Sequence, residues 1–163
     1  MKKIKILAVL AISLAAITLN SCKKKDVKPA NSITASVDGT NTSFNTSAKA
    51  IKTTVQGVSV TTIQGTAANG ANLAIMLSGA VEAGHTYAAA ANSPSDEPLI
   101  ALTSSADQFW NDDSSSNLVS VTITSVTTSS IQGTFKGNLV STTSGSNTPA
   151  TKVIANGTFN VSF

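Results

Sequence analysis

Hydrophobic and polar residues alternate along most of the chain after residue 30. In the segment ITASVD, Ile33, Ala35 and Val37 share one side, and in SVTITSV the same holds for Val121 and Ile123. The closing segment VIANGTFNVSF alternates in the same way. A period of two with a polar outer side is typical of antiparallel strands that face a core on one side and solvent on the other. We therefore expect an all-β fold.

Turn signals separate the alternating segments and set the expected strands. The pairs Asp38-Gly39 and Asn69-Gly70 favour tight hairpins. The predicted strands cover residues 33–37, 41–45, 49–55, 58–67, 71–78, 85–89, 98–103, 118–126, 130–140 and 151–163. About eight to ten short strands of this kind predict an antiparallel β-sandwich or a small, soluble barrel-like sheet.

The tetrapeptide Ile-Gln-Gly-Thr occurs twice, at residues 63–66 and 131–134. In the second copy, Ile131, Gly133 and Phe135 fall on one side of the predicted strand. A glycine inside a strand leaves a gap that a neighbouring ring can fill, whereas a nucleotide-binding loop would need its glycines before a helix. We therefore predict that Gly133 makes room for a ring such as that of Phe159.

The first thirty residues indicate export and lipidation. Lys2, Lys3 and Lys5 precede an apolar run that is long enough for a signal peptide and too short to cross a bilayer. The run ends in LNSC, which resembles a bacterial lipobox, and Cys22 is the only cysteine of the chain. We expect a cleaved signal peptide at residues 1–21, a lipidated Cys22 with a basic tether at 22–30, and one β-rich domain at 31–163.

Net charge changes once the signal peptide is removed. The full chain carries a formal charge of +3, but the expected mature chain has equal numbers of lysines and acidic residues and no arginine. The tether CKKKDVKPA is basic, and the rest is mildly acidic. Nucleic acid is therefore not an expected partner. A basic tether beside an acyl anchor is attracted to anionic lipid headgroups, although a solvated linker explains it equally well.

Together, the anchor, the length and three segments resemble the small outer-membrane lipoproteins of Bacteroidetes-type bacteria that carry an all-β domain of unknown function. The segments are ITASVDGTNTSF, VTITSVTTSSIQGTF and ANGTFNVSF. The resemblance implies an exported domain anchored in the outer membrane and transfers no catalytic or binding residues. In such bacteria acidic residues after the cysteine accompany surface display, so Lys23 to Lys25 imply a periplasm-facing position.

Residues 92–117 break the alternation and are expected to form a long functional loop. Trp110, the only tryptophan, lies there beside Phe109 and Asn111. An aromatic ring among polar side chains suits a glycan, because the ring packs against the C–H surface of a sugar while the polar groups bind its hydroxyls. A ring that anchors the loop to the core would give the same pattern.

Acidic residues in the same stretch suggest a calcium site. Asp107, Asp112 and Asp113 offer the hard oxygen ligands that Ca²⁺ prefers. Their spacing matches no defined calcium loop, and a solvated acidic loop is the alternative. No other cofactor is expected.

Catalytic chemistry is poorly represented in the sequence. His85, the only histidine, could act as a general base for a serine nucleophile if a carboxylate oriented it, but no Gly-x-Ser-x-Gly motif is present. We therefore expect a lipid-anchored envelope protein without catalytic activity, a binding or structural module for a glycan or a protein. An envelope hydrolase that uses His85 is the alternative.

Overall fold

The computed structural model describes residues 31–88, 97–111, 119–141 and 149–163, and this part of the chain consists of strands and turns without a helix. The strands are β1 (Ser32–Val37), β2 (Thr40–Ser43), β3 (Thr46–Val55), β4 (Val58–Thr66), β5 (Asn72–Ser78), β6 (Thr86–Ala88), β7 (Leu99–Thr103), β8 (Gln108–Trp110), β9 (Ser120–Val126), β10 (Ser130–Ser141) and β11 (Thr151–Ser162). All strand pairs are antiparallel. The predicted all-β, antiparallel class is confirmed.

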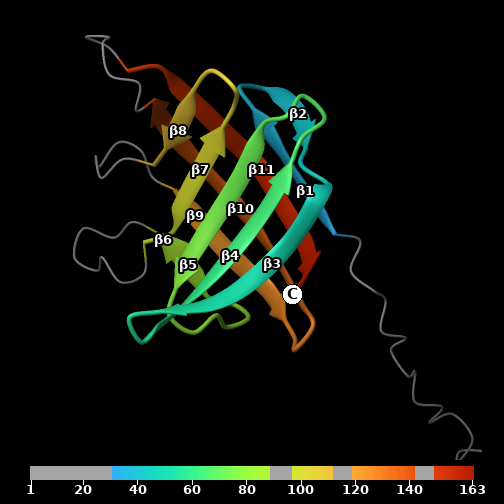
Figure 1. Ribbon diagram of the computed structural model, residues 1–163, viewed down its shortest axis with the longest axis vertical. Coiled ribbons are helices and arrows are strands. Elements are labelled where there is room, and N and C mark those ends of the chain that lie inside the picture. Colours follow the sequence, from blue (N-terminus) through green and yellow to red (C-terminus); the bar gives the residue numbers. More distant parts are fainter. Residues whose placement is uncertain (1–30, 89–96, 112–118, 142–148) are drawn as a thin grey trace, which may run out of the picture.

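The strands form one strongly curled sheet, a half-barrel. Their order is β2-β1-β11-β10-β8-β7-β5-β4-β3, and β9 lies beside β10 with β6 on its outer edge. The first and last strands of this order are consecutive in the chain, because only Phe44 and Asn45 separate β2 from β3. Figure 1 shows the result, in which β3, β4, β5 and β7 lie in front of β10 and β11 and cross them steeply.

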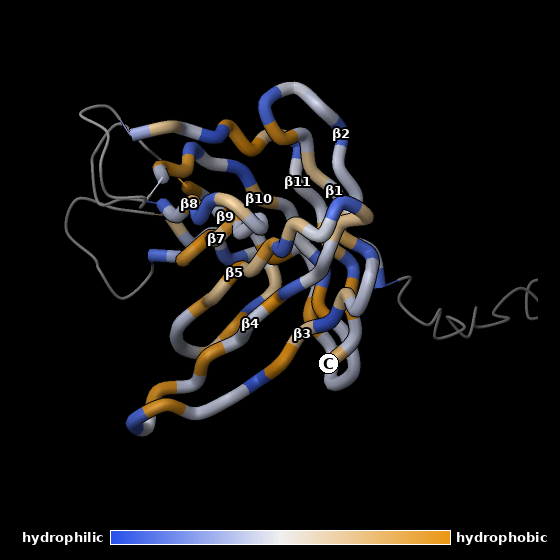
Figure 2. Tube along the Cα trace, turned by 45° about the horizontal axis from the view of Figure 1, so that its top comes forward, coloured by the Kyte–Doolittle hydropathy of each residue, from blue (hydrophilic) through white to orange (hydrophobic). Residues whose placement is uncertain are grey.

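The inward side of the curl forms a single core. Alternate residues of each strand are buried, as the sequence pattern predicts, and Ile63, Ile75 and Ile100 of the front strands have no exposed surface. From the back strands, Ile123, Ile131 and Val161 are equally buried. Figure 2 shows apolar and polar positions alternating along the strands. Burial of this apolar surface is the main source of stability, since the expected mature chain has no disulfide.

Strand boundaries agree closely with those predicted from the sequence, with one correction. Residues 92–117 were expected to form a long loop beyond the strand at 98–103, but Gln108 to Trp110 form strand β8. This strand pairs with β7 on one side and with the end of β10 on the other. Trp110 and Phe109 therefore sit inside the sheet rather than on a loop.

The first Ile-Gln-Gly-Thr copy lies where the sheet turns its corner. Gly65 faces inward, and a side chain there would collide with the backbone of Phe44 and with the Ile33 side chain. The amide of Phe44 donates a hydrogen bond to the Ile33 carbonyl at 2.8 Å, and the Ile33 amide donates to Asn45 Oδ1 at 2.9 Å. Glycine at position 65 thus allows the β2–β3 corner to approach β4.

In the second copy, a glycine faces a ring twice. Gly133 of β10 is paired with Phe159 of β11, and Phe135 is paired with Gly157. A Cβ atom on Gly133 would lie 2.5 Å from Phe159 Cζ, and one on Gly157 would lie 2.7 Å from the Phe135 ring. The predicted packing of Gly133 against Phe159 is confirmed, and the reciprocal pair doubles it.

The outward side of the back strands is rich in hydroxyl groups. Threonines occupy directly paired positions across five strands, and we call them the threonine row: Thr86, Thr122, Thr134, Thr158 and Thr34. At one end of the row a 2.9 Å hydrogen bond joins the hydroxyls of Thr86 and Thr122. At the other end a 3.0 Å hydrogen bond joins those of Thr158 and Thr34. Among the residues that line the open hollow over this row, Lys136 alone carries a charge.

Candidate functional site

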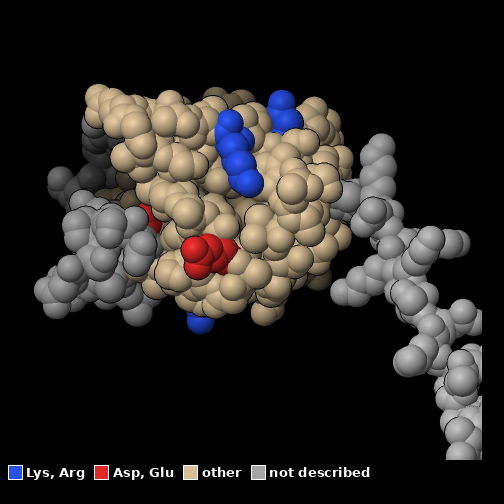
Figure 3. Space-filling view, turned by 90° about the horizontal axis from the view of Figure 1, so that it is seen from below, with Lys and Arg blue, Asp and Glu red and all other residues tan. Residues whose placement is uncertain are grey.

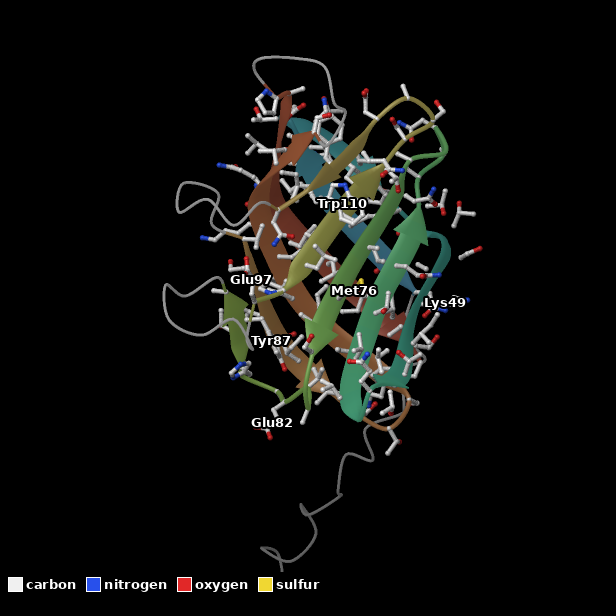
Figure 4. The ribbon with its side chains drawn as sticks, turned by 60° about the vertical axis from the view of Figure 1, so that its left-hand side comes forward. Lys49, Met76, Glu82, Tyr87, Glu97 and Trp110 are labelled. Carbon is white, nitrogen blue, oxygen red and sulfur yellow. The ribbon has the colours of Figure 1, made fainter. Side chains whose placement is uncertain are left out.

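Trp110 lies on the outward side of β8, the strand between β7 of the front and β10 of the back. It is paired with Ala101 of β7 and with Val140 of β10, and 36% of its surface is exposed. Because side chains alternate along a strand, Phe109 points the other way, into the core. Figure 4 shows Trp110 and Met76 over the same run of strands.

Two adjacent rows of outward residues cross the strands at this position. The first row continues from Trp110 through small side chains to an amide: Trp110, Ala101, Ala74 and Gln64. The second row, one outward position further along each strand, is entirely polar and uncharged: Gln108, Thr103, Asn72 and Thr66. We call these eight residues the Trp110 face.

A shallow hollow of about 320 Å³ lies at the far end of the Trp110 face from Trp110. Both rows contribute to its lining, through Gln64 and Ala74 of the first row and Thr66, Asn72 and Thr103 of the second. The Thr66 hydroxyl donates a hydrogen bond to Asn72 Oδ1 at 2.6 Å, which fixes the orientation of that amide. The face therefore combines an aromatic ring, a floor of small side chains and oriented amide and hydroxyl groups.

None of the eight residues of the two rows is charged, and among the described residues a charge lies at their margin. Lys49 of β3 is paired with Gln64, at the end of the first row farthest from Trp110. Amides and hydroxyls can both donate and accept hydrogen bonds. Such a surface suits a neutral ligand that carries many hydroxyl groups.

The other two residues predicted to contact a ligand have structural roles. Phe109 is buried. Asn111 accepts a hydrogen bond from the Ile100 amide through Oδ1 at 2.7 Å, and its Nδ2 donates to the Pro98 carbonyl at 3.1 Å. Asn111 therefore fastens the end of β8 to β7, and of the three predicted residues only Trp110 is presented outward on the sheet.

Asp107 and Phe109 line a different space, a hollow of about 280 Å³ at one open end of the half-barrel, which we call the mouth. Lys152 Nζ lies there 5.6 Å from the centre of the Phe109 ring and forms an ion pair with Asp38 Oδ2 at 2.7 Å. The hydrogen bond from Lys152, together with one from the Val153 amide, lowers the pKa of Asp38 below its usual value of 3.8. The positive charge of Lys152 is thus balanced by the carboxylate of Asp38 within the mouth.

The predicted calcium site falls mostly outside the described residues. Asp112 and Asp113 lie there, and in the described ranges no three acidic, histidine or cysteine side chains are grouped so as to hold a metal. Asp107 takes part in the β7–β8 turn through its backbone, which bonds to Ser104. At the opposite end of β7, Glu97 Oε1 is buried and finds no hydrogen-bond partner among the described residues. A calcium ion thus stays a sequence prediction.

His85 lies on an exposed turn before β6. Its ring packs edge-on against Tyr87, with the ring centres 4.5 Å apart, and its amide donates a 3.4 Å hydrogen bond to the Glu82 carbonyl. Within the described part of the chain, no hydrogen bond joins the imidazole to a serine or a carboxylate. The arrangement required by the hydrolase alternative is therefore not assembled among these residues.

Cys22 and the tether precede the first described residue, Asn31. Among residues 31–88, 97–111, 119–141 and 149–163, no helix has the length and apolar character needed to cross a membrane.

Comparison with known proteins adds no assignment: no protein-family model, curated protein or solved structure matches the chain.

Sequence reasoning did not identify the second row of the Trp110 face. Alternation places Thr103, Asn72 and Thr66 on outward sides, but it does not say which of them become neighbours. That depends on the register of β4, β5, β7 and β8. The signal for Trp110 itself was its position among polar residues.

Proposed function

We propose that the protein is a lipid-anchored, non-catalytic binding module of the bacterial envelope, and that the Trp110 face binds a neutral glycan. The observation that carries this proposal is the outward position of Trp110 on the sheet beside a fully uncharged polar row. The ring offers a flat apolar surface for the C–H face of a sugar. The amides of Gln108 and Asn72 and the hydroxyl of Thr103 would bind sugar hydroxyls, the last two in addition to the hydrogen bonds that they make within the protein.

The shape of the face favours a chain over a single sugar. The two rows extend from β8 across β7 and β5 to β4, and neighbouring strands are about 4.8 Å apart. This makes the face about 14 Å long, enough for several sugar units that lie across the strands. The hollow beyond Ala74 would hold the end of such a chain.

Lipidation of Cys22 would hold the domain at the membrane, because two or three acyl chains give stable anchoring where one is marginal. The resemblance to Bacteroidetes-type lipoproteins supports the outer membrane and a periplasm-facing position. A periplasmic module of this kind would hold glycan strands or sugar-bearing envelope components near the membrane. The uncharged face does not suit nucleic acid, which needs a basic surface.

Binding can be tested with the mature chain carrying Cys22→Ser, which removes the lipid and keeps the domain. Trp110 is the only tryptophan, so its fluorescence reports directly on contact with a ligand. We expect neutral polysaccharides to change the intensity or wavelength of this emission. Trp110→Ala should weaken binding at least tenfold in an affinity-gel or glycan-array measurement, which corresponds to about 1.4 kcal/mol.

Met76→Ala provides the matched control, since Met76 is exposed on the same sheet and lies outside both rows. It should bind as the unmodified protein does. Because Trp110 is only 36% exposed, its truncation also removes packing, so thermal unfolding of both variants is measured and binding is compared at a temperature where both are folded. Full affinity in the Trp110→Ala variant would refute the proposed face.

A further inference from the structure

One end of the half-barrel gathers the entry of the chain, its C-terminus and the end of β3. Asn31 Oδ1 accepts hydrogen bonds from the amide and the hydroxyl of Ser162, at 2.8 Å and 2.9 Å. The next residue, Phe163, has its ring 4.0 Å from Lys52 Nζ. We call this the tether end, because the residues that link the domain to Cys22 join it here. The mouth lies at the opposite end.

The β3–β4 hairpin projects from the body on the side away from the C-terminus, as Figure 2 shows. Val55 and Val58 face each other across its turn, and they are 56% and 50% exposed. Gln56 and Gly57 have φ angles of 50° and 83°, which produce a tight turn. The hairpin therefore presents two exposed apolar side chains at its tip.

Positive charge accompanies this apolar tip. Lys52 lies three residues before Val55 and on the other face of β3, beside Phe163, which is itself 36% exposed. Figure 3 views the molecule from this end and shows lysines together with an acidic side chain near the middle of the face, on an otherwise uncharged surface. The tether adds four lysines, Lys23, Lys24, Lys25 and Lys28, against one acid, Asp26. Apolar side chains next to lysines are the combination that binds anionic lipid surfaces.

Chain length brings this end to the membrane. The nine residues 22–30 can span about 30 Å at most, at 3.3–3.6 Å per residue. If Cys22 is lipidated, Asn31 is therefore held within that distance of the headgroups. Such a tether gives the nearest surface of the domain a high effective concentration at the bilayer, so that weak contacts become populated.

We infer that the tether end docks on the anionic lipid surface, with the Val55–Val58 tip among the headgroups and Lys52 beside their phosphates. This inference rests on the anchor of the proposed function, but not on glycan binding. Docking fixes the orientation of the domain: the mouth points away from the membrane, and the Trp110 face stands to the side, where a ligand can reach it.

The mature lipoprotein allows a direct test. Acylation consumes the only native thiol, so a Val55→Cys variant has one reactive cysteine. Val153→Cys is the matched control, because Val153 is similarly exposed, at 49%, and lies near the mouth beside Asp38. Each variant is labelled with a polarity-sensitive fluorophore and reconstituted into vesicles of phosphatidylethanolamine and phosphatidylglycerol in a 3:1 ratio, about the proportion of an anionic bacterial bilayer.

We expect the label at position 55 to shift to shorter wavelength and to be quenched by spin-labelled lipid several-fold more than the label at position 153. Equal quenching at both positions, in protein that floats with the vesicles, would overturn the docking inference and leave the anchor intact. Protein that fails to float, with Cys22 open to labelling, would instead disprove the anchor.

A second measurement uses the unlipidated Cys22→Ser chain. Val55→Asp combined with Val58→Asp should lower its partition onto phosphatidylglycerol vesicles at least threefold. Both residues are exposed, so unchanged thermal unfolding is expected for the double variant. Equal binding of the parent chain to phosphatidylcholine vesicles would overturn the role given to the lysines.

Discussion

At the scale of single residues, glycine positions decide how tightly the sheet can curl. Gly133 and Gly157 each give their space to the ring paired with them, so that Phe159 and Phe135 lie flat across neighbouring strands. The two rings also contact each other, with their centres 6.3 Å apart. At both positions the missing glycine side chain leaves the space that the paired phenylalanine ring occupies, and this packing shapes β10 and β11.

Replacement of Gly157 by alanine should therefore destabilise the protein. The new Cβ would lie 2.5 Å from the Phe135 carbonyl oxygen and 2.7 Å from its ring, and overpacking of this kind costs about 1–3 kcal/mol. Thr134→Ala, an outward change on the same strand, should cost about 0.5 kcal/mol or less. Urea unfolding distinguishes the two, and equal midpoints would contradict the packing role.

The sequence allowed part of this arrangement to be predicted. Alternation put Gly133 and Phe135 on one side of a strand, and the similar segment ANGTF suggested Phe159 as the ring. The reciprocal pair of Phe135 and Gly157 required the exact register of β10 and β11, including its shift between Phe135 and Gly137. Registers are set by contacts distant in sequence, which local patterns do not contain.

At the scale of elements, strand β8 holds the candidate site and was not predicted. It is three residues long and is followed by Asn and Asp, which are turn formers. The strand is held by its pairing with β7 and β10 and by the Asn111 side chain, and not by the local strand propensity of its residues. Trp110 was singled out from composition, but its outward direction depends on this tertiary pairing.

Asn111→Ala should loosen β8. The substitution leaves the Ile100 amide and the Pro98 carbonyl without their side-chain partners, which should lower the free energy of unfolding by about 1–3 kcal/mol. Hydrogen exchange at the Ile100 amide should accelerate, and glycan affinity should fall through the displaced Trp110. Asn138→Ala, an outward change on β10, is the control; identical exchange in both variants would show that pairing alone holds β8.

At the scale of the whole molecule, the all-β class of the fold was predictable from the sequence, but the curling of the strands into one sheet was not. Ten of the strands follow from alternation and turn signals. Whether they form two stacked sheets or one curled sheet depends on the β2–β3 corner, where Phe44 and Asn45 bond back to Ile33. Nothing in the local pattern distinguishes that corner from an ordinary loop between two sheets.

Few charges contribute to the fold, and the Asp38–Lys152 pair at the mouth is one that does. The pKa of Asp38 is lowered in the folded protein, so its stabilising effect is present above about pH 4 and is lost as the pH falls through the folded pKa. Asp38→Asn keeps the shape and tolerates the φ angle of 49°. It should cost less than about 1 kcal/mol at pH 6, because the pair is well exposed.

The difference between Asp38→Asn and the parent chain should shrink as the pH is lowered to about 2.5, below the usual carboxyl pKa. Urea unfolding at the two pH values provides the measurement. A difference that persists unchanged at the lower pH would show that the carboxylate charge has no part in the effect.

The threonine row bears on how neighbouring copies of the protein would interact if the chain is anchored in a membrane. Proteins held on a membrane meet one another sideways far more often than proteins in solution, and charged flanks would make those encounters attractive or repulsive according to the salt around them. Hydroxyl groups keep their hydrogen bonds to water at any ionic strength. If the chain is anchored as proposed, copies that collide through the threonine row would form few lasting contacts and would separate again.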